Sequence, residues 1–458
     1  MHITPIPHPL SATVRVPGSK SLTNRALLIA SLANGTTRLT NALFSDDSRY
    51  FAKALQTLGF DIQLEEAKHE MTVTGLGGKI PATKAELFIG NAGTAARFLS
   101  AFLTLGNGEY ILDGEPRMRE RPIGDLIDSL TQLGANIQPI PHSAFRILHS
   151  ICPPVKIIAN GLPGGKAKIA GDISSQFLSA LLMVAPYAKS EIEITLSTDL
   201  NSKPYVDMTI AIMQDFGVQI QQNAYQSFSI PITNYVTPKR SGAEQLPTNL
   251  QSPVSNLQFS TYPIESDASA ASYFFAAPAI CGGTVKVENI SRKSVQGDIA
   301  FLDVLKQMGC EVEETNNSIT VYRPSSIVGV DVDMRDIPDT AQTLAVVAPF
   351  ASSPTRIRGI ASARLKETDR IHATCTELER LGVQVEEHQD GMTIYPIFNL
   401  QPATCKPAII QTYNDHRMAM AFSLIGLRFD GVTIENPSCV SKTFPNFFEA
   451  LAQLQVEG

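Results

Sequence analysis

The chain lacks tryptophan altogether, and charged residues make up only 18% of its 458 positions. Basic residues are in the minority, because 37 Lys and Arg stand against 44 Asp and Glu, which gives a net charge of -7. A generic nucleic-acid-binding protein is normally basic, so this balance argues against one. No apolar run reaches the length of a membrane span. The composition, 43% hydrophobic with 30 Gly, is typical of a globular protein.

Cysteine is scarce and scattered. The six cysteines include no CxxC pair, which argues against a zinc site and against a disulfide framework, and predicts buried thiols in a reducing compartment. The N-terminus has no basic region followed by an apolar stretch, so we predict a cytoplasmic protein without a signal or transit peptide. The cysteines are Cys152, Cys281, Cys310, Cys375, Cys405 and Cys439.

What the chain does contain is an internal repeat. An amphipathic helix that ends in Gly or a near-equivalent recurs and runs into a β-rich stretch. The Gly suits the left-handed residue that follows a helix and lets the next strand begin. The copies lie at 54–59, 129–134, 212–217, 305–309, 378–382 and 448–454.

A second helix, rich in Ala, Leu and Ser, precedes each copy. Its sequence shows almost no polar face, so we predict that it is buried on all sides. The unit is buried helix, strand, amphipathic helix, strand, and six such units divide naturally into two domains of three. This alternation predicts the α/β or α+β class without choosing between them. The buried helices are expected after Ser21, Gly93, Ser174, Asp267, Asp339 and Asp415.

Residues 231–265 interrupt the repeats. This stretch contains several Pro, Ser, Asn and Gln and has no apolar periodicity, so it is predicted to be a loop. A chain of this length exceeds one ordinary core, so we expect two domains or three small ones, and we place a domain boundary in this stretch.

Cations concentrate where the buried helices are expected to begin. The unpaired N–H groups and partial positive charge of a helix N-terminus favour anions. Lys20 and Arg25 bring two cations to the first such start, although a capped helix with two surface cations would look the same. At 90–97, two glycines bracket Asn91 and Arg97 follows one turn later. Gly in the first turn lowers helix stability, so a closely approaching ligand is the favoured interpretation here.

Two polar segments of the first half allow two interpretations each. The three arginines of 117–121 lie beside prolines, and such a rigid loop suits bidentate capture of carboxylate or phosphate. A solvated charged face is the alternative. Ser174 and Ser175 offer hydroxyls at a helix start, where an ordinary N-cap is the simpler explanation.

Two segments of the second half are equally ambiguous. Asp339 could be a plain helix cap or, among so many cations, a general base. Lys366 and Arg370 are expected one helical turn apart with Glu367 beside them, which would also fit a salt-bridged surface helix. Each motif alone is weak evidence for an anion-binding site. The stronger evidence is that cations recur at equivalent places in the repeats.

Taken in order, these motifs resemble the 5-enolpyruvylshikimate-3-phosphate synthase family. The resemblance runs from about residue 3 to the end, apart from the 231–263 loop. The matching segments are PGSKSLTNRALLIASLANG (17–35), GNAGTAARF (90–98), RERPIGDLIDSL (119–130), DISSQFLSALLM (172–183), SKPYVDMT (202–209), SDASAASYF (266–274), IPDTAQTLA (337–345), RLKETDRI (364–371), YNDHRMAMA (413–421) and SKTFPNFFEAL (441–451).

The resemblance implies two similar domains, each of three βαβαββ repeats with buried helices, the inside-out α/β barrel of the enolpyruvyl transferase fold. The first domain would span 19–264, including the irregular loop 231–263, and the second would join 1–18 to 265–458. The active site would lie in the cleft between the domains, which closes on substrate and excludes water.

The activity implied is transfer of the enolpyruvyl group of phosphoenolpyruvate to the 5-hydroxyl of shikimate 3-phosphate, in the shikimate pathway of aromatic amino-acid biosynthesis. The 5-hydroxyl attacks C2 while C3 is protonated, and phosphate then leaves the tetrahedral intermediate. This chemistry calls for positioned acids and bases but no metal or redox cofactor. The two small molecules are the expected partners of a monomeric protein, with no nucleic acid and no membrane.

The resemblance also implies roles for individual residues. The catalytic residues would be Asp339, Glu367, Lys20 and Lys442. Those binding phosphoenolpyruvate would be Lys20, Asn91, Gly93, Arg121, Gln176, Arg370, Arg417 and Lys442. Those binding shikimate 3-phosphate would be Ser21, Arg25, Ser174, Ser175, Gln176, Ser202, Tyr205, Asp339, Ser362 and Lys366.

Two other functions fit parts of the pattern. UDP-N-acetylglucosamine 1-carboxyvinyltransferase shares the fold and the donor, but usually carries a reactive Cys in the loop that here spans 114–121, where none is present. A non-catalytic anion-binding scaffold is the other alternative. The joint presence of Asp339, Glu367, Lys20 and Lys442 argues against it.

The chain departs from the family pattern at Phe98, where many relatives carry Pro, and at Ser362, which is often Asn. Glyphosate occupies the phosphoenolpyruvate site of sensitive relatives. Gly93 leaves room for it, whereas Phe98 is expected to narrow the site. We therefore predict that glyphosate still inhibits this protein, but with a higher inhibition constant than it has for a sensitive relative. A constant equal to that of a sensitive relative, unchanged by Phe98→Pro, would contradict this prediction.

Overall fold

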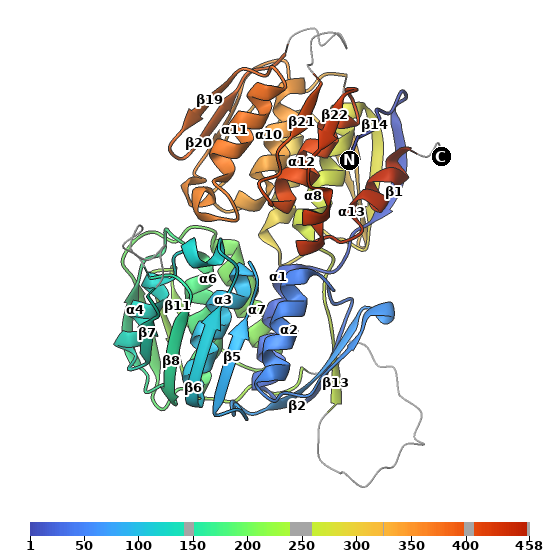
Figure 1. The fold of residues 1–458 in the computed structure, drawn as a ribbon. Helices are drawn as coiled ribbons and strands as arrows, with labels where there is room; N and C mark the ends of the chain where they lie inside the picture. Colours follow the sequence, from blue (N-terminus) through green and yellow to red (C-terminus); the bar gives the residue numbers. More distant parts are fainter. Residues whose placement is uncertain (142–150, 239–258, 324, 398–406, 456–458) are drawn as a thin grey trace, which may run out of the picture. The chain divides into compact units, whose positions relative to one another are not determined.

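The computed structural model describes residues 1–141, 151–238, 259–323, 325–397 and 407–455. The chain forms two compact units, one of Gly18–Ile264 and one that joins Met1–Pro17 to Glu265–Gly458 (Figure 1). Among the helices of the described residues, none is both long and apolar enough to cross a membrane. The five cysteines in these residues form no disulfide, and Cys405 lies outside them.

Three helices form the centre of the Gly18–Ile264 unit. Nearly all of their residues are buried, as their sequence predicts, and α3 packs against both α1 and α6. Helix α1 begins at Lys20 because the Ser19 side chain accepts a hydrogen bond from the backbone N–H of Leu22. The three are α1 (Lys20–Leu32), α3 (Gly93–Phe102) and α6 (Ser175–Val184).

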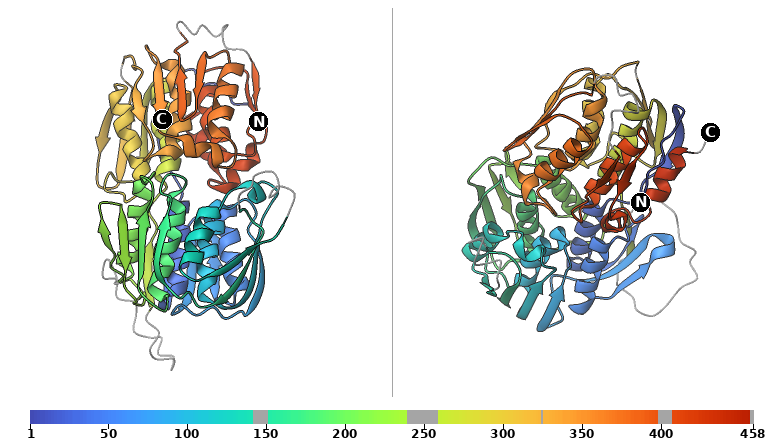
Figure 2. Two further views of the ribbon diagram at one scale, coloured as in Figure 1. Left: turned by 90° about the vertical axis from the view of Figure 1, so that its left-hand side faces the viewer. Right: turned by 45° about the horizontal axis from the view of Figure 1, so that its top comes forward.

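Three four-stranded sheets enclose these helices (Figure 2). Their strand orders are β13-β2-β4-β3, β5-β6-β8-β7 and β11-β12-β10-β9. The strands are β2 (Asn34–Thr40), β3 (Ile62–Glu65), β4 (Glu70–Leu76), β5 (Lys84–Phe88), β6 (Asn107–Asp113), β7 (Asn136–Pro139), β8 (Val155–Asn160), β9 (Gly165–Ile169), β10 (Ile192–Leu196), β11 (Gln221–Asn223), β12 (Ser227–Ile230) and β13 (Phe259–Pro263). The amphipathic helices are α2 (Asp46–Thr57), α4 (Gly124–Gln132) and α7 (Lys203–Asp215).

The sheets share one topology. In the second sheet, β5 pairs parallel with β6 across α3, and β8 then pairs antiparallel with both β6 and β7. The third sheet repeats this arrangement with β9 and β10 around α6. A parallel pair with a helical crossover followed by an antiparallel hairpin is the βαβαββ unit.

One strand was not expected. The stretch 231–263 was predicted to be irregular, but its last residues form β13, which pairs parallel with β2 at the edge of the first sheet. That prediction is therefore wrong for Phe259–Pro263, and 239–258 lies outside the described residues. The sequence does not predict this strand, because five residues are too few to show a clear alternation of apolar and polar side chains.

The second unit repeats the design. Its buried helices are α8 (Ala268–Cys281), α10 (Ala341–Val347) and α12 (His416–Gly426), and its outer helices are α9 (Phe301–Gln307), α11 (Arg370–Arg380) and α13 (Phe447–Ala452). The sheet orders are β1-β14-β16-β15, β17-β18-β20-β19 and β21-β22. The strands are β1 (Leu10–Arg15), β14 (Gly283–Glu288), β15 (Glu311–Glu314), β16 (Ser318–Tyr322), β17 (Asp331–Asp333), β18 (Thr355–Arg358), β19 (Val385–His388), β20 (Gly391–Ile394), β21 (Ala408–Ile410) and β22 (Val432–Ile434).

The sixth repeat is incomplete in the described residues. Its sheet holds only β21 and β22, and the N-terminus of the chain supplies the next neighbour. His2 forms an antiparallel bridge with Thr433, and the N–H of Ile3 donates to the carbonyl of Val432 at 3.0 Å. The first residues of the chain thus complete the last repeat.

The glycines after the amphipathic helices adopt the left-handed conformation that the repeat predicts. Gly134 has φ +89°, and a Cβ atom there would lie 2.7 Å from Cγ of Pro163. Gly165, the first residue of β9, also has a positive φ of +105°, but a Cβ atom added there would meet no atom within 4 Å. The two sites therefore separate backbone strain from steric overlap.

We expect Gly134→Ala to lower the free energy of unfolding by more than about 1 kcal/mol, since it combines a positive φ with a clash. Gly165→Ala carries the backbone strain alone and should lower it less. Urea denaturation of both variants checks the order. An equal loss in the two would show that Pro163 moves aside.

Candidate active site

Arg370, at the start of α11, lies at the centre of a buried charged cluster in the second unit. Its Nε donates to Oδ2 of Asp415 at 2.7 Å, and its Nη2 donates to Oε2 of Glu367 at 2.7 Å. Its Nη1 reaches Oδ1 of Asp339 at 3.2 Å. Only 4% of Arg370 is exposed. Burial alone would lower the pKa of Arg370, but the three carboxylates outweigh it and raise that pKa above its usual value.

Two further cations share these carboxylates. Nη2 of Arg417, on α12, donates to Oδ2 of Asp339 at 2.6 Å. Nζ of Lys442 lies 3.0 Å from Oε1 of Glu367. Asp339 and Glu367 therefore each contact two cations. A buried charge is stable only when it is paired and hydrogen-bonded, and this shared arrangement meets that condition.

The structure corrects two expectations about this cluster. Asp339 is not a plain helix cap, because it lies within a 3₁₀ turn, the N-cap residue of α10 is Thr340, and Asp339 pairs with Arg370 and Arg417. Lys366 and Arg370 do not share a helix, because α11 begins only at Arg370. The segment before it contains a 3₁₀ turn, Ala361–Leu365, which includes Ser362 and has Lys366 as its C-cap residue.

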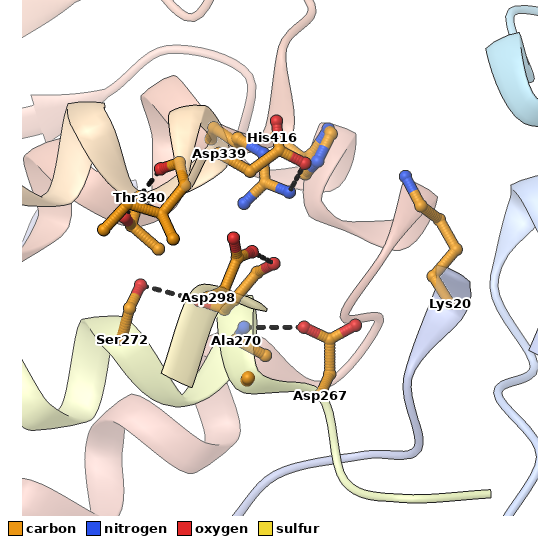
Figure 3. A network of polar contacts seen from close by, with 12 residues as sticks. Lys20, Asp267, Ala270, Ser272, Asp298, Asp339, Thr340 and His416 are labelled. Carbon is orange, nitrogen blue, oxygen red and sulfur yellow. Dashed lines mark hydrogen bonds and ion pairs between the residues drawn. The ribbon is translucent and has the colours of Figure 1, made fainter. Parts of the chain in front are cut away.

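A carboxylate that the sequence did not single out, Asp298, interacts electrostatically with Asp339 of this cluster. Asp298 is 3% exposed, and its carboxyl is hydrogen-bonded by the Ser269 hydroxyl of α8 (Figure 3). Burial, followed by the nearby charge of Asp339, raises the pKa of Asp298 to about 7. No motif marks this residue, because it follows a Gly in a 3₁₀ turn with no cation beside it in sequence.

The first unit contributes a second polar group. Nζ of Lys20, in the first turn of α1, lies 3.5 Å from Oδ2 of the buried Asp47. Nη1 of Arg121 donates to both oxygens of Asn91, the carbonyl and Oδ1, at 3.1 Å each. A Cβ atom on Gly93 would come within 2.5 Å of Nη2 of Arg121, so the glycine permits this close approach.

The other two arginines of the 117–121 loop do not join this group. Arg119 pairs with Asp113 at 2.6 Å and Arg117 pairs with Glu120 at 2.9 Å, and both are partly exposed. The solvated interpretation therefore holds for these two, and only Arg121 is buried.

Arg25 is enclosed in the first unit. Its Nε donates to Oγ1 of Thr209 at 2.7 Å, and its Nη2 donates to Oγ of Ser179 and to the carbonyl of Tyr205. Its guanidinium carbon also lies 5.2 Å from the ring centroid of the fully buried Phe98. Burial lowers the pKa of Arg25 to about 10. Phe98 thus belongs to the core beside Arg25, and its effect on inhibitors stays a prediction.

The remaining predicted residues lie at the starts of α6 and α7 or in the first turn of α1. Ser174 caps α6 by accepting a hydrogen bond from the N–H of Gln176 at 3.3 Å, as the capping interpretation predicts. Ser202 precedes α7 with φ +58°, and Tyr205 lies in the first turn of that helix. Ser175 begins α6, and Ser21 follows Lys20 in α1.

Known proteins match this chain over its whole length. The profile of a family described as EPSP synthase (3-phosphoshikimate 1-carboxyvinyltransferase) matches residues 5–451. A 3-phosphoshikimate 1-carboxyvinyltransferase of Shewanella denitrificans is 47% identical over 100% of this chain and 99% of its own length. A protein of the same description from Nostoc punctiforme is 46% identical over 99% of each. The chain belongs to the EPSP synthase family.

Solved structures agree on the fold. An EPSP synthase from Acinetobacter baumannii superposes with a TM-score of 0.76 at 24% identity, covering 99% of this chain and 97% of its own. The enolpyruvyl transferase NikO from Streptomyces tendae gives a TM-score of 0.70 at 16% identity. The predicted mixed α/β enolpyruvyl transferase fold is thus confirmed. The activity is EPSP synthase activity, in the shikimate pathway.

The buried carboxyl of Asp298 gives a pH prediction for this EPSP synthase family member. Its pKa is raised from 3.8 to about 7 in the folded chain, so its contribution to stability is full below the lower value and is lost as the pH rises through the higher one. Asp298→Asn keeps an acceptor for Ser269 without the charge. We expect this variant to gain stability relative to wild type as the pH rises between these values.

Urea denaturation at about pH 5 and about pH 8 measures this difference. A stability difference that stays constant with pH would contradict the prediction. Asp331→Asn is the matched control, because Asp331 pairs with Arg358 on an exposed strand and 65% of its side chain is accessible.

Proposed function

We propose that the buried charged cluster of the second unit and the polar group of the first bind phosphoenolpyruvate and shikimate 3-phosphate and carry out enolpyruvyl transfer between them. One observation carries the proposal. Asp339 and Glu367, the two carboxylates proposed for proton transfer, each contact two of the cations proposed to bind phosphoenolpyruvate. Proton transfer by the carboxylates and anion binding by the cations would therefore occur within one ion-paired cluster.

Phosphoenolpyruvate would be bound by charge-assisted hydrogen bonds, each contributing about 1.5–3 kcal/mol. Arg370 and Arg417 are held by carboxylates in fixed orientations, so little ordering remains to be done when the anion arrives. The full set would be Lys20, Asn91, Gly93, Arg121, Gln176, Arg370, Arg417 and Lys442. That these residues meet in a cleft between the units stays a prediction.

Shikimate 3-phosphate would be bound mainly by hydroxyls at helix starts. Ser174 and Ser175 begin α6, where N–H groups and the helix dipole favour a phosphate. Arg25 supports this subsite by holding the carbonyl of Tyr205. The complete set would be Ser21, Arg25, Ser174, Ser175, Gln176, Ser202, Tyr205, Asp339, Ser362 and Lys366.

In the first step Asp339 would accept the proton of the 5-hydroxyl as its oxygen bonds to C2 of phosphoenolpyruvate. Glu367 would deliver a proton to C3, with Lys20 assisting, and the product of this step is the tetrahedral phospho-lactyl intermediate. In the second step Glu367 would take a proton back from C3, the C2–O bond to phosphate would break, and the departing phosphate would take up the proton held by Asp339, which leaves a C2–C3 double bond in the new enol ether. The sum is one enolpyruvyl group transferred and one phosphate released.

The acceptor is tested by phosphate release from the purified protein with phosphoenolpyruvate and either shikimate 3-phosphate or UDP-N-acetylglucosamine. We expect release with shikimate 3-phosphate alone, because the 114–121 loop carries no Cys. Release with UDP-N-acetylglucosamine would favour the sister activity, and release with neither would favour an anion-binding scaffold.

The site is tested by Asp339→Asn, which keeps the size of the side chain but cannot accept the proton. We expect kcat to fall by about 10²- to 10⁴-fold, the usual contribution of general acid–base catalysis. Asp333→Asn is a control in the same unit, since Asp333 pairs only with its exposed neighbour Arg335 among the ion pairs described for it. Equal rates in Asp339→Asn and wild type would remove Asp339 from the mechanism.

A further inference from the structure

The turn that leads into α12 is backbone-strained. Two consecutive residues, Tyr413 (φ +52°) and Asn414 (φ +55°), adopt the left-handed conformation, and the N–H of Asp415 closes the turn on the carbonyl of Thr412 at 2.8 Å. Such turns usually contain Gly, because a side chain with a Cβ atom is disfavoured at positive φ. A bulky Tyr at this position persists only where its surroundings hold it.

The group that holds the turn is a carboxylate from α11. Glu377 is fully buried, and its Oε1 accepts a hydrogen bond from the Tyr413 hydroxyl at 2.8 Å. Its Oε2 accepts from the backbone N–H of Gln411 at 3.1 Å and lies 3.0 Å from Nε of Arg380. Burial, and then the bond to Glu377, raises the pKa of Tyr413 to about 12, so the phenol remains a donor at working pH.

This turn positions Asp415, a residue of the charged cluster. Asp415 is the last residue of the turn and is wholly buried. Its Oδ2 accepts from Nε of Arg370 at 2.7 Å, and its Oδ1 accepts from the backbone N–H of Arg417 at 2.9 Å. A shift of the turn would therefore move the orientation of Arg370 and the first turn of α12 together.

We propose that Glu377 is a positioning residue that clamps the strained Thr412–Asp415 turn through Tyr413, and so fixes Arg370 and Arg417 for phosphoenolpyruvate. The inference rests on the proposed site, because it needs these two arginines to bind that substrate. Glu377 itself contacts neither arginine in the described hydrogen bonds and ion pairs. Its action passes through Asp415.

The clamp is tested by comparing Tyr413→Phe with Tyr413→Gly in the full chain. Tyr413→Phe keeps the unfavourable backbone but loses the hydroxyl, so we expect KM for phosphoenolpyruvate to rise about three- to tenfold while kcat changes less than about twofold. Tyr413→Gly loses the hydroxyl as well, but glycine adopts positive φ without strain. We expect its KM to return to within about twofold of wild type.

A merely structural role for the ring would give the opposite order, because glycine removes more packing than phenylalanine does. Tyr395→Phe is the matched control, since it deletes a similar bond of 2.8 Å to Glu386 on an exposed part of the same unit and should leave KM unchanged. Melting temperatures measured in parallel separate loss of fold from loss of position.

Arg417→Ala distinguishes failure of this inference from failure of the proposed site. If Arg417→Ala leaves KM for phosphoenolpyruvate unchanged, the site assignment is wrong. If Arg417→Ala raises KM and Tyr413→Phe does not, the clamp is wrong. A KM for Tyr413→Gly above that of Tyr413→Phe would likewise overturn it.

Discussion

The charged cluster of the second unit depends on one requirement, that a buried guanidinium be matched by carboxylates. Arg370 meets it with three, Asp339, Glu367 and Asp415, which come from separate segments of the unit. Removing any one of these carboxylates would leave a buried positive charge without its partner. Such a loss is far more destabilising than replacing the whole ion pair by apolar side chains. The positions of a 3₁₀ turn, a loop and the start of α12 are thereby tied to one side chain.

The buried helices explain why this cluster can form where it does. A helix enclosed on all sides presents its N-terminus at one end of the repeat, and α12 is capped by Asp415 and carries Arg417 in its first turn. The same geometry in the first unit gives α1 the Ser19 cap and Lys20. The polar residues therefore gather at the N-termini of these helices, because the rest of each helix is buried.

Much of this could be read from the sequence because it depends on local signals. The Gly134 turn, the Ser174 cap and the buried helices each follow from a few neighbouring residues. Asp298 and Glu377 could not be found in this way, because their importance comes from partners on other elements. Glu377 looks like one more charge on an amphipathic helix, yet it is fully buried. Strand β13 was missed for a related reason, since only its pairing with β2 makes it a strand.

The joining of both chain ends in one unit has a consequence for how the protein is made. Strand β1 pairs with β14, and the side chains of Arg15 and Glu288 in this pair are separated by 273 positions. During synthesis all of Gly18–Ile264 emerges before β14 exists. Strand β1 therefore lacks its neighbour in the sheet until β14 has been synthesised. Its short length and alternating polar residues suit a strand that has to avoid aggregation until its partner arrives.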